Sequence, residues 1–462
     1  MSDAVLQQVS ARASQDLKRT IDDLCAYLRV PAISCEPEHV GDVRALAATV
    51  AQDLAALGFV SQVRDLEGAL PLVAAHWDKA GPSKPTVLVY GHLDLQPAGQ
   101  GWTQTTAHVP KIKRGRLYAR GSADDMGGWM SHVAAIRAWQ EVTGGLPCNL
   151  KLIVESEEEI GSPNLERFID AYPQDFTADA MILTDCENPS TRVPGLTVSL
   201  RGLMEAELTV EVMRGDVHSG LWGNVVPDAA TALCQAIAKL VTPQGRVQGA
   251  LVEPSAAKVA GAQAVPISKA DVRKSVHLLP GVSVLPLQGR SVGEWLWLQP
   301  AVTVVATTLP TASEKRNALK GKVSATLSIR LAPGQTPEAI MSALRHSLRK
   351  APQGVKLTLE QRGEAGEGWS YDAQGPAFEA VDRAYQSAWG CKLARIGVGG
   401  SIPFVAMFAR RFGDLPLILN GVMDPQTGAH GPDESMDLDV FAKSIQANIA
   451  LYHELSVPGI LK

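Results

Sequence analysis

Histidines and acidic residues recur in this chain where an apolar run has just ended or where glycine makes a turn. The segments that contain them are 91–94 (GHLD), 121–125 (GSADD), 157–162 (EEEIGS), 184–186 (TDC) and 429–432 (AHGP). Imidazole and carboxylate groups without cysteine suit zinc or a similar divalent ion. Such ligands, gathered from several distant segments, are typical of a hydrolase that uses two metal ions.

A two-metal site sets a requirement that these segments can meet. Two ions about 3.5–4 Å apart need one bridging carboxylate and two further ligands each. The residues that satisfy this requirement are His92, Asp124, Glu159, Asp185 and His430. Each segment alone has a simpler interpretation, such as an ordinary turn, a solvated acidic face or a helix N-cap. So many coincidences at strand ends are improbable, and we expect one shared site.

Two more acidic residues lie beside these ligands. Asp94 is two residues from His92, and after a strand its carboxylate can accept the second ring N–H of that histidine. Glu158 precedes a predicted ligand and is expected to point elsewhere. A carboxylate next to the metals can take a proton from water and pass it to a leaving amine, so Glu158 is the candidate general base.

Alternating strands and helices in the first part of the chain must position these residues. The predicted strands include 86–90, 150–154 and 180–183, and the predicted helices include 14–30, 43–57 and 127–142. The alternation predicts an α/β fold with a mainly parallel sheet covered on both faces. In such sheets the carboxyl ends of the strands form sites, so ligands from distant segments can converge there.

The pattern changes after residue 194, where half-exposed strands replace buried ones. The predicted elements are strands at 203–212, 301–308, 322–331 and 355–361, helices at 225–241 and 336–349, and lid loops at 245–262 and 289–294. They are typical of a small α+β domain inserted into the first. We therefore predict a discontinuous catalytic domain at 1–195 and 364–462 and an inserted domain at 196–363.

Composition excludes little but agrees with this organisation. The chain has 462 residues, of which 45% are hydrophobic and 20% charged, as in ordinary globular proteins of two domains. A net charge of −5 gives no sign of a nucleic-acid or membrane partner. No apolar run reaches the roughly 20 residues that span a bilayer. The six cysteines are widely spaced, so we expect free thiols and a cytoplasmic protein.

Several longer motifs give the chain a family resemblance. They are 91–97 (GHLDLQP), 120–125 (RGSADD), 158–162 (EEIGS), 216–220 (DVHSG), 330–335 (RLAPGQ), 399–403 (GGSIP) and 429–430 (AH). With these motifs the chain resembles the carnosinase and cytosolic nonspecific dipeptidase branch of the dinuclear zinc exopeptidases. The wider family includes acetylornithine deacetylase, succinyl-diaminopimelate desuccinylase and aminoacylase. The resemblance extends over nearly the whole chain.

The resemblance implies a role for each predicted site residue. The two ions, zinc or alternatively manganese or cobalt, would be held with Asp124 as the bridge, His92 and Asp185 on one ion, and Glu159 and His430 on the other. Glu158 would be the general base that activates a metal-bridging water. The peptide bond between Asp124 and Asp125 is expected to be cis.

The resemblance also implies how substrate is held. The inserted domain would form a homodimer and send His218 and Asn317 into the partner's active site, where His218 stabilises the oxyanion. Arg330, Gly400 and Ser401 would bind the substrate, with Arg330 and Ser401 on its carboxylate. The implied activity is hydrolysis of the amide bond of a small carboxylate-bearing molecule, most simply a dipeptide. The alternatives are an N-acyl amino-acid amidohydrolase and a catalytically silent binding protein of the same fold.

A few positions depart from the family pattern. Met126 replaces a lysine, and Leu319-Lys320 replaces Ile-Pro. Gly397-Val398 replaces the Arg-Glu that precedes the GGSIP motif. Valine cannot pair with an ammonium group, and a glycine at 397 would leave room beside it. One hypothesis is therefore a substrate without a cationic α-amine at that point. The other is an ordinary dipeptide whose amine is bound by another acid, such as Glu187 or Asp185.

Overall fold

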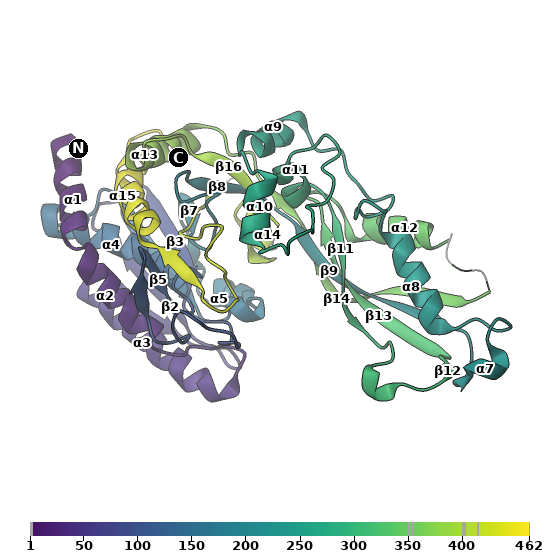
Figure 1. Ribbon diagram of the computed structural model, residues 1–462. Coiled ribbons are helices and arrows are strands. Elements are labelled where there is room, and N and C mark those ends of the chain that lie inside the picture. Colours follow the sequence, from purple (N-terminus) through teal and green to yellow (C-terminus); the bar gives the residue numbers. More distant parts are fainter. Residues whose placement is uncertain (1–2, 350–351, 353, 400–402, 414, 462) are drawn as a thin grey trace. The chain divides into compact units, whose positions relative to one another are not determined.

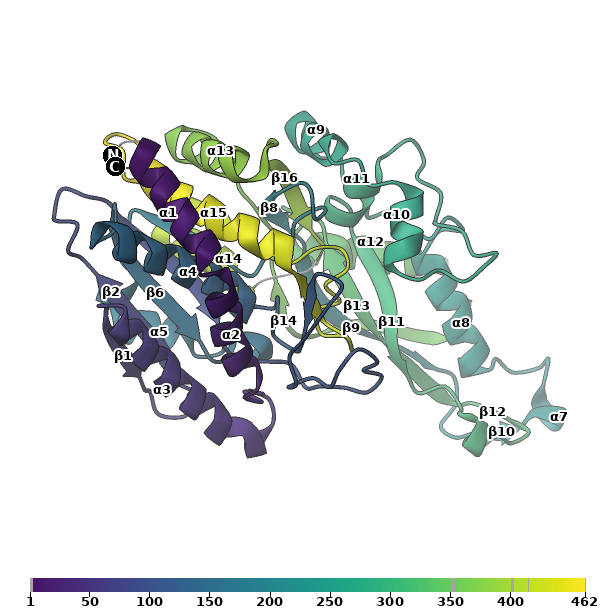
Figure 2. The ribbon, with the colours of Figure 1, turned by 60° about the vertical axis from the view of Figure 1, so that its left-hand side comes forward.

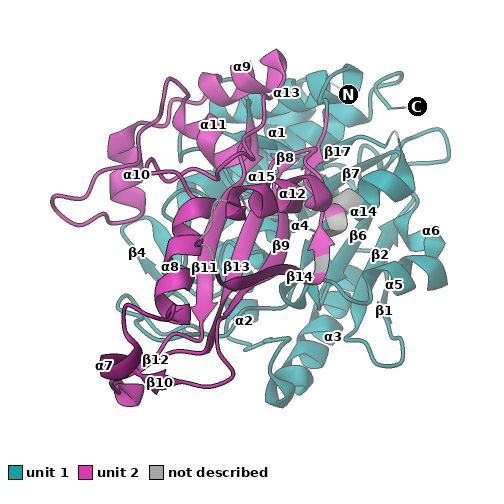
Figure 3. Cartoon of the chain, turned by 90° about the vertical axis from the view of Figure 1, so that its right-hand side faces the viewer, with its two compact units in different colours: residues 1–198, 372–395, 407–462 teal, residues 199–371, 396–406 magenta. Residues whose placement is uncertain are grey.

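The computed structural model describes residues 3–349, 352, 354–399, 403–413 and 415–461. The chain forms two compact units, coloured separately in Figure 3: the first contains residues 1–198, 372–395 and 407–462, and the second contains 199–371 and 396–406. The second unit extends beyond residue 363 because its last long strand continues to Gly366, opposite Leu203. Figures 1 and 2 show the course of the chain.

The first unit is built on a six-stranded sheet. Its order is β1 (Val60–Arg64), β2 (Leu72–Trp77), β6 (Asn149–Glu155), β3 (Thr86–His92), β7 (Ala180–Leu183) and β17 (Leu417–Leu419). The last four strands pair in parallel with one another. Strand β2 pairs antiparallel with both of its neighbours, β1 and β6. Strand β3 is buried almost throughout, as its unbroken apolar sequence predicts for a parallel strand covered on both faces.

Helices cover this sheet. They are α1 (Asp3–Gln15), α2 (Leu17–Leu28), α3 (Val40–Ala56), α4 (Met126–Thr143), α5 (Leu165–Ala171), α6 (Pro173–Phe176), α13 (Pro376–Trp389) and α15 (Leu438–Leu455). The division of the chain into units falls within α14 (Pro403–Phe412). Helix α4 packs on β3 and contacts α1, α2 and α15. Short elements complete the unit: η1 (Pro37–His39), η2 (Glu158–Ile160), β4 (Lys111–Lys113), β5 (Arg116–Tyr118) and β18 (Ser435–Asp437).

The second unit contains a four-stranded antiparallel sheet. Its order is β11 (Ala301–Thr307), β13 (Lys322–Leu331), β9 (Gly202–Glu211) and β14 (Lys356–Gly366). Alternate residues of β9 and β13 are buried and form one core with helices α8 (Ala229–Leu240) and α12 (Pro337–Leu348). A separate two-stranded ladder joins β10 (Val217–His218) to β12 (Ala318–Leu319). The other elements are α7 (Ser219–Trp222) and η3 (Ala312–Glu314). A further three-stranded sheet has the order β15 (Trp369–Ser370), β8 (Gly195–Leu200) and β16 (Ala394–Val398), and the division of the chain into units falls within β8 and within β16.

The predicted fold class is confirmed: an α/β unit with a mainly parallel sheet, and an inserted α+β unit. The predicted lid loops are wrong in part, because α9 (Ala256–Ala264), α10 (Lys269–Ser275) and α11 (Val292–Trp297) occupy or flank them. Ser291 and Glu294 form a capping box at the start of α11, which is a sequence signal for a helix in a segment predicted to be a loop. Within the described residues, no helix combines the length and apolar character needed to cross a membrane.

Candidate metal centre

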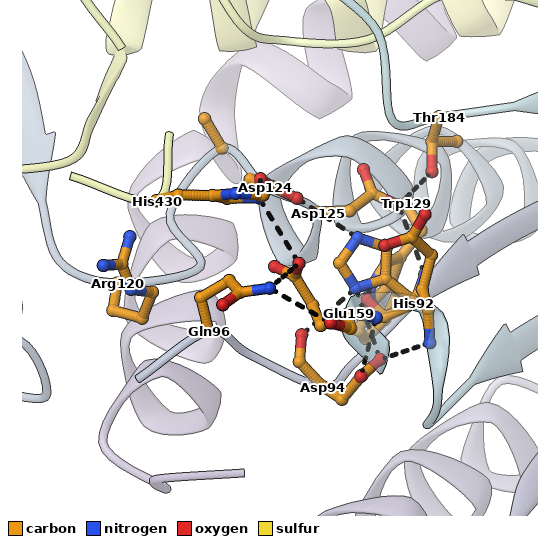
Figure 4. A network of polar contacts seen from close by, with 12 residues as sticks. His92, Asp94, Gln96, Arg120, Asp124, Asp125, Trp129, Glu159, Thr184 and His430 are labelled. Carbon is orange, nitrogen blue, oxygen red and sulfur yellow. Dashed lines mark hydrogen bonds and ion pairs between the residues drawn. The ribbon is translucent and has the colours of Figure 1, made fainter. Parts of the chain in front are cut away.

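The predicted ligands of the first unit meet at the carboxyl ends of its parallel strands. His92 is the last residue of β3, Glu159 lies in η2 shortly after β6, and Asp185 follows β7. Asp124 comes just before α4, and His430 comes from the loop between β17 and β18. Figure 4 shows His92, Asp124, Glu159 and His430 turned toward one another. Adjacent parallel strands end at the same edge, which explains why segments far apart in sequence converge here.

The two carboxylate oxygens of Asp124 face different histidines. Oδ1 lies 3.2 Å from Nε2 of His92, and Oδ2 lies 3.0 Å from Nε2 of His430. The same His430 nitrogen is 3.3 Å from Oε2 of Glu159. Two groups each bring one possible ligand atom per residue within 4.8 Å of the others: His92, Asp124 and Asp185, and Asp124, Glu159 and His430. Asp124 is common to both groups, so this donor set fits two ions joined by one carboxylate.

Burial and mutual repulsion raise the pKa values of three carboxylates near Asp124. Burial, followed by the charge of Asp124, raises the pKa of Asp185 to about 8 and the pKa of Glu159 to about 7. Burial also raises the pKa of Glu158 well above its ordinary value. Divalent cations would stabilise the ionised forms, because they place positive charge where these carboxylates otherwise repel one another.

The pKa values of the two histidines are raised as well, but the cause is contact with carboxylates and not burial. Burial acts to lower the pKa of His92, but its contacts with the carboxylates of Asp124 and Asp94 raise it well above the ordinary value. The hydrogen bond to Asp124 raises the pKa of His430 to about 9. The neighbouring carboxylates thus favour the protonated forms of both imidazole rings. A metal ion requires the neutral imidazole as its ligand, so binding would release those protons.

Asp94 holds the acidic segment in place. Its Oδ1 accepts the N–H of Glu158 at 3.2 Å, and its Oδ2 accepts the N–H of Glu159 at 3.0 Å. Nδ1 of His92 donates to the main-chain oxygen of Asp94 at 3.1 Å, whereas the carboxylate lies 3.5 Å from that nitrogen. The expected carboxylate–imidazole contact is therefore the longer of the two. The main structural role of this carboxylate is to fix η2, and with it Glu158 and Glu159.

Asp125 joins three of the ligand segments. The Asp124–Asp125 peptide is cis, as expected. Oδ2 of Asp125 accepts the hydroxyl of Thr184 at 2.6 Å and the N–H of His92 at 3.3 Å. A Cβ atom on Gly128 would lie 2.0 Å from Oδ1 of Asp125, and one on Gly91 would lie 2.6 Å from Oδ2. These two glycines are required because the Asp125 carboxylate occupies the space that a side chain would fill.

A buried ion pair that the sequence did not predict holds the main chain at Asp124. Nη1 of Arg120 lies 2.7 Å from Oε2 of Glu434. Both residues are buried: Glu434 is 0% exposed and Arg120 is 1% exposed. Oε1 of Glu434 accepts the N–H groups of Ala123 at 3.3 Å and Asp124 at 3.4 Å. Nε2 of Gln96 donates to Oε2 of Glu159 at 2.9 Å. Arg120 and Gln96 stood within quoted motifs, but no local pattern marks Glu434.

The second unit brings together two residues predicted to act across a dimer interface. His218 pairs with Ala318 in the β10–β12 ladder, and the N–H of Ser219 donates to the main-chain oxygen of Asn317 at 3.1 Å. Both His218 and Asn317 are exposed. Asp216, which the sequence analysis quoted without a role, links the same strands by accepting the N–H of Gly321 at 2.9 Å.

Of the remaining predicted substrate-binding residues, the structure describes Arg330. Arg330 lies near the end of β13, opposite Ala301 on one side and Leu203 on the other. Gly400 and Ser401 lie outside the described residues.

The predicted space beside Gly397 is absent. A Cβ atom on Gly397 would lie 2.5 Å from Cβ of Trp297 and 2.7 Å from Oγ of Ser199. The side chain of Trp297 fills this region, so the expectation of extra room there is wrong. The glycine allows tight packing against the tryptophan and does not enlarge a pocket.

Comparison with known proteins identifies the family. Residues 88–454 match the model for peptidase family M20/M25/M40. The chain belongs to this family. It is 33% identical over 76% of its length to a cysteinylglycine-S-conjugate dipeptidase of Corynebacterium striatum, 77% of which is covered. It is also 26% identical, over 94% of both chains, to a Cys-Gly metallodipeptidase of Schizosaccharomyces pombe.

Solved structures agree on the fold of this M20-family peptidase. Human carnosine dipeptidase 1 superposes with a TM-score of 0.80 at 22% identity, covering 98% of this chain and 99% of that one. The dipeptidase Dug1p of Saccharomyces cerevisiae gives a TM-score of 0.79 at 23% identity, with coverage of 98% and 99%. The predicted family and the predicted class of enzyme, a metal-dependent hydrolase, are confirmed. Family membership and the ligand groups together imply divalent metal at the site.

Proposed function

We propose that this peptidase hydrolyses dipeptides with a free carboxylate and uses two zinc ions held by the ligands predicted from the sequence. The observation that most supports the proposal is the position of Asp124, whose two oxygens face His92 and His430 at 3.2 and 3.0 Å. One carboxylate shared by two ligand groups is the arrangement that a pair of bridged ions requires. Asp185 and Glu159 complete the two groups.

The chemistry divides between the ions and the chain. Two divalent ions, when bound, supply Lewis acidity at the scissile carbonyl and lower the pKa of water. The carboxylate of Glu158 accepts a proton from the attacking water and returns it to the leaving amine nitrogen. Asp94 orients this base by holding its N–H at 3.2 Å. Burial and neighbouring charges raise the pKa of Glu158, so its protonated form is accessible for the second step.

The substrate is bound by Arg330, Gly400 and Ser401, with Arg330 and Ser401 on its carboxylate. The second unit forms a homodimer, through which His218 and Asn317 reach the partner's active site and His218 stabilises the oxyanion. The ladder that places these two residues side by side supports their acting together. Strand β11 supports the dimer, since it is at the edge of its sheet and exposes Val304 (39%) and Val305 (54%).

The protein is placed in the cytoplasm, without nucleic-acid or membrane partners. All six cysteines are free, as in proteins of a reducing compartment. The net charge of −5 offers no basis for attraction to a polyanion.

The decisive experiment is turnover of matched free and N-acetylated dipeptides by metal-free protein reloaded with zinc, manganese or cobalt, followed by mass spectrometry. We expect the free dipeptides to be cleaved and zinc to restore activity. Cleavage of the N-acetylated forms alone would assign the amidohydrolase activity instead. Two bound ions without any cleavage would identify a silent binding protein. Glu158→Gln serves as the control that binds metal without turnover.

A further inference from the structure

Two arginines of the second unit lie near each other at one end of its sheet. Arg330 on β13 stands opposite Leu203 on β9, and Arg201 precedes Leu203 by two residues. Diagonal neighbours on adjacent antiparallel strands are within reach of long side chains. The apolar core, which includes Met204 and Ile329, uses the alternate residues of both strands. The two arginines therefore occupy the face of the sheet opposite to the core.

Arg201 has only neutral partners. Its Nε donates to the main-chain oxygen of Gly399 at 3.0 Å, and its Nη1 donates to the main-chain oxygen of Gln299 at 3.4 Å. A Cβ atom on Gly399 would lie 2.9 Å from Nη2, so the guanidinium is packed closely against that backbone. Among the residues that the structure describes, no carboxylate forms an ion pair with Arg201.

Within the described residues, the charge of Arg201 is not neutralised by any carboxylate. Burial, and then the charge of Arg330, lowers the pKa of Arg201 to about 10. Burial likewise lowers the pKa of Arg330. A partly buried guanidinium that is close to a second cation and has only neutral partners is unfavourable unless an anion approaches it. A carboxylate is a suitable anion, because its two oxygens match the paired N–H groups of guanidinium.

We propose that Arg201 and Arg330 together form the receptor for the substrate's carboxylate, with Arg201 as a second specificity-determining residue. The proposal deepens the dipeptidase function and rests on it. Arg201 also positions the segment that leads into Gly400 and Ser401, because it holds the carbonyl of Gly399 and donates its own N–H to the carbonyl of Val398 at 3.3 Å. One residue thus contributes charge and fixes the start of the adjoining segment.

The test compares alanyl-glycine with alanyl-glycinamide, which differ only in the terminal carboxylate. The measured quantity is the ratio of their kcat/KM values. Arg201→Gln keeps an N–H donor near Gly399 but removes the charge, and we expect the ratio to fall about 10- to 100-fold, mainly through KM for the free dipeptide. Arg201→Lys should lower the ratio less, because lysine keeps the charge but not the fork. The control Arg362→Gln removes an arginine of the same unit that pairs with Glu207 at 2.7 Å, and it should leave the ratio unchanged.

An unchanged ratio in either folded variant of Arg201 would overturn the proposal. An equal loss on both substrates would also overturn it, since that result assigns Arg201 a purely structural role. If the wild-type protein cleaves neither substrate, the dipeptidase function fails separately. The carboxylate receptor is then tested without turnover, by the thermal stabilisation that N-acetylglycine gives and N-acetylglycinamide does not. Equal effects of those two probes on the wild type would refute the receptor.

Discussion

Replacing Glu158 with glutamine should separate proton transfer from every other property of the site. Within the described residues, the Glu158 carboxylate has no hydrogen-bond partner, while its main-chain N–H is held by Asp94 at 3.2 Å. The substitution therefore removes a proton acceptor and breaks no structural contact. General-base catalysis contributes about 10²- to 10⁴-fold, so kcat should fall by that factor, or about 2.7–5.4 kcal/mol in activation free energy.

The neighbouring Glu157 provides a matched control. Its carboxylate is buried and accepts the N–H of Leu70 at 2.8 Å and the amide of Asn164 at 2.9 Å. Glu157→Gln should therefore destabilise the fold by about 1–3 kcal/mol, because one acceptor becomes a donor facing donors. Its turnover should stay within a few-fold of the wild type. The two adjacent substitutions thus have opposite expected effects, one on catalysis and the other on stability.

The assay combines dipeptide kinetics with two controls on the same preparations. Bound metal is measured by mass spectrometry of the elements, and stability is measured from urea unfolding followed by circular dichroism. Glu158→Gln should retain both ions and the wild-type midpoint. Turnover of this variant within tenfold of the wild type would refute its role as the base. Loss of metal from it would show that Glu158 is itself a ligand.

Three further results are expected. Asp124→Ala should lose activity and most bound metal, because one side chain serves both ligand groups; two ions still bound per chain would contradict the bridge. Mixing inactive His218→Ala and Glu158→Gln chains should restore part of the activity, since one mixed active site then has both residues intact; verified heterodimers without activity would return His218 to its own subunit. Burial lowers the pKa of His132 to about 3. Below pH 6.5 the unfolded chain therefore binds a proton that the folded chain does not, and the free energy of unfolding decreases as the pH is lowered. At pH 5 this effect costs about 2 kcal/mol, and His132→Gln should reduce the difference in unfolding free energy between pH 7 and pH 5 by that amount; an undiminished difference would exclude His132 as its source.

The sequence predicted the core of the first unit well, because its signals there are local. Strands β3, β6 and β7 contain apolar runs; His92 ends β3, and Glu158–Glu159 and Asp185 lie within a few residues of the ends of β6 and β7. Prediction was poorer between β9 and β13, where α9 and α11 occupy parts of the expected loops and α10 was not predicted. Only short signals, such as the Ser291–Glu294 capping box, mark those helices.

What the sequence determined by itself was the chemical type of the ligands and the strand ends at which they lie. Both follow from residue identity and from apolar periodicity over a few positions. The tertiary structure decided which atoms meet: the two oxygens of Asp124 face different histidines, and Glu434 supports Asp124 across 310 residues of chain. It also placed Arg201 beside the Gly399 carbonyl, 198 residues away, and filled the space next to Gly397 with Trp297. These contacts join distant segments and depend on side-chain direction, which no local pattern specifies.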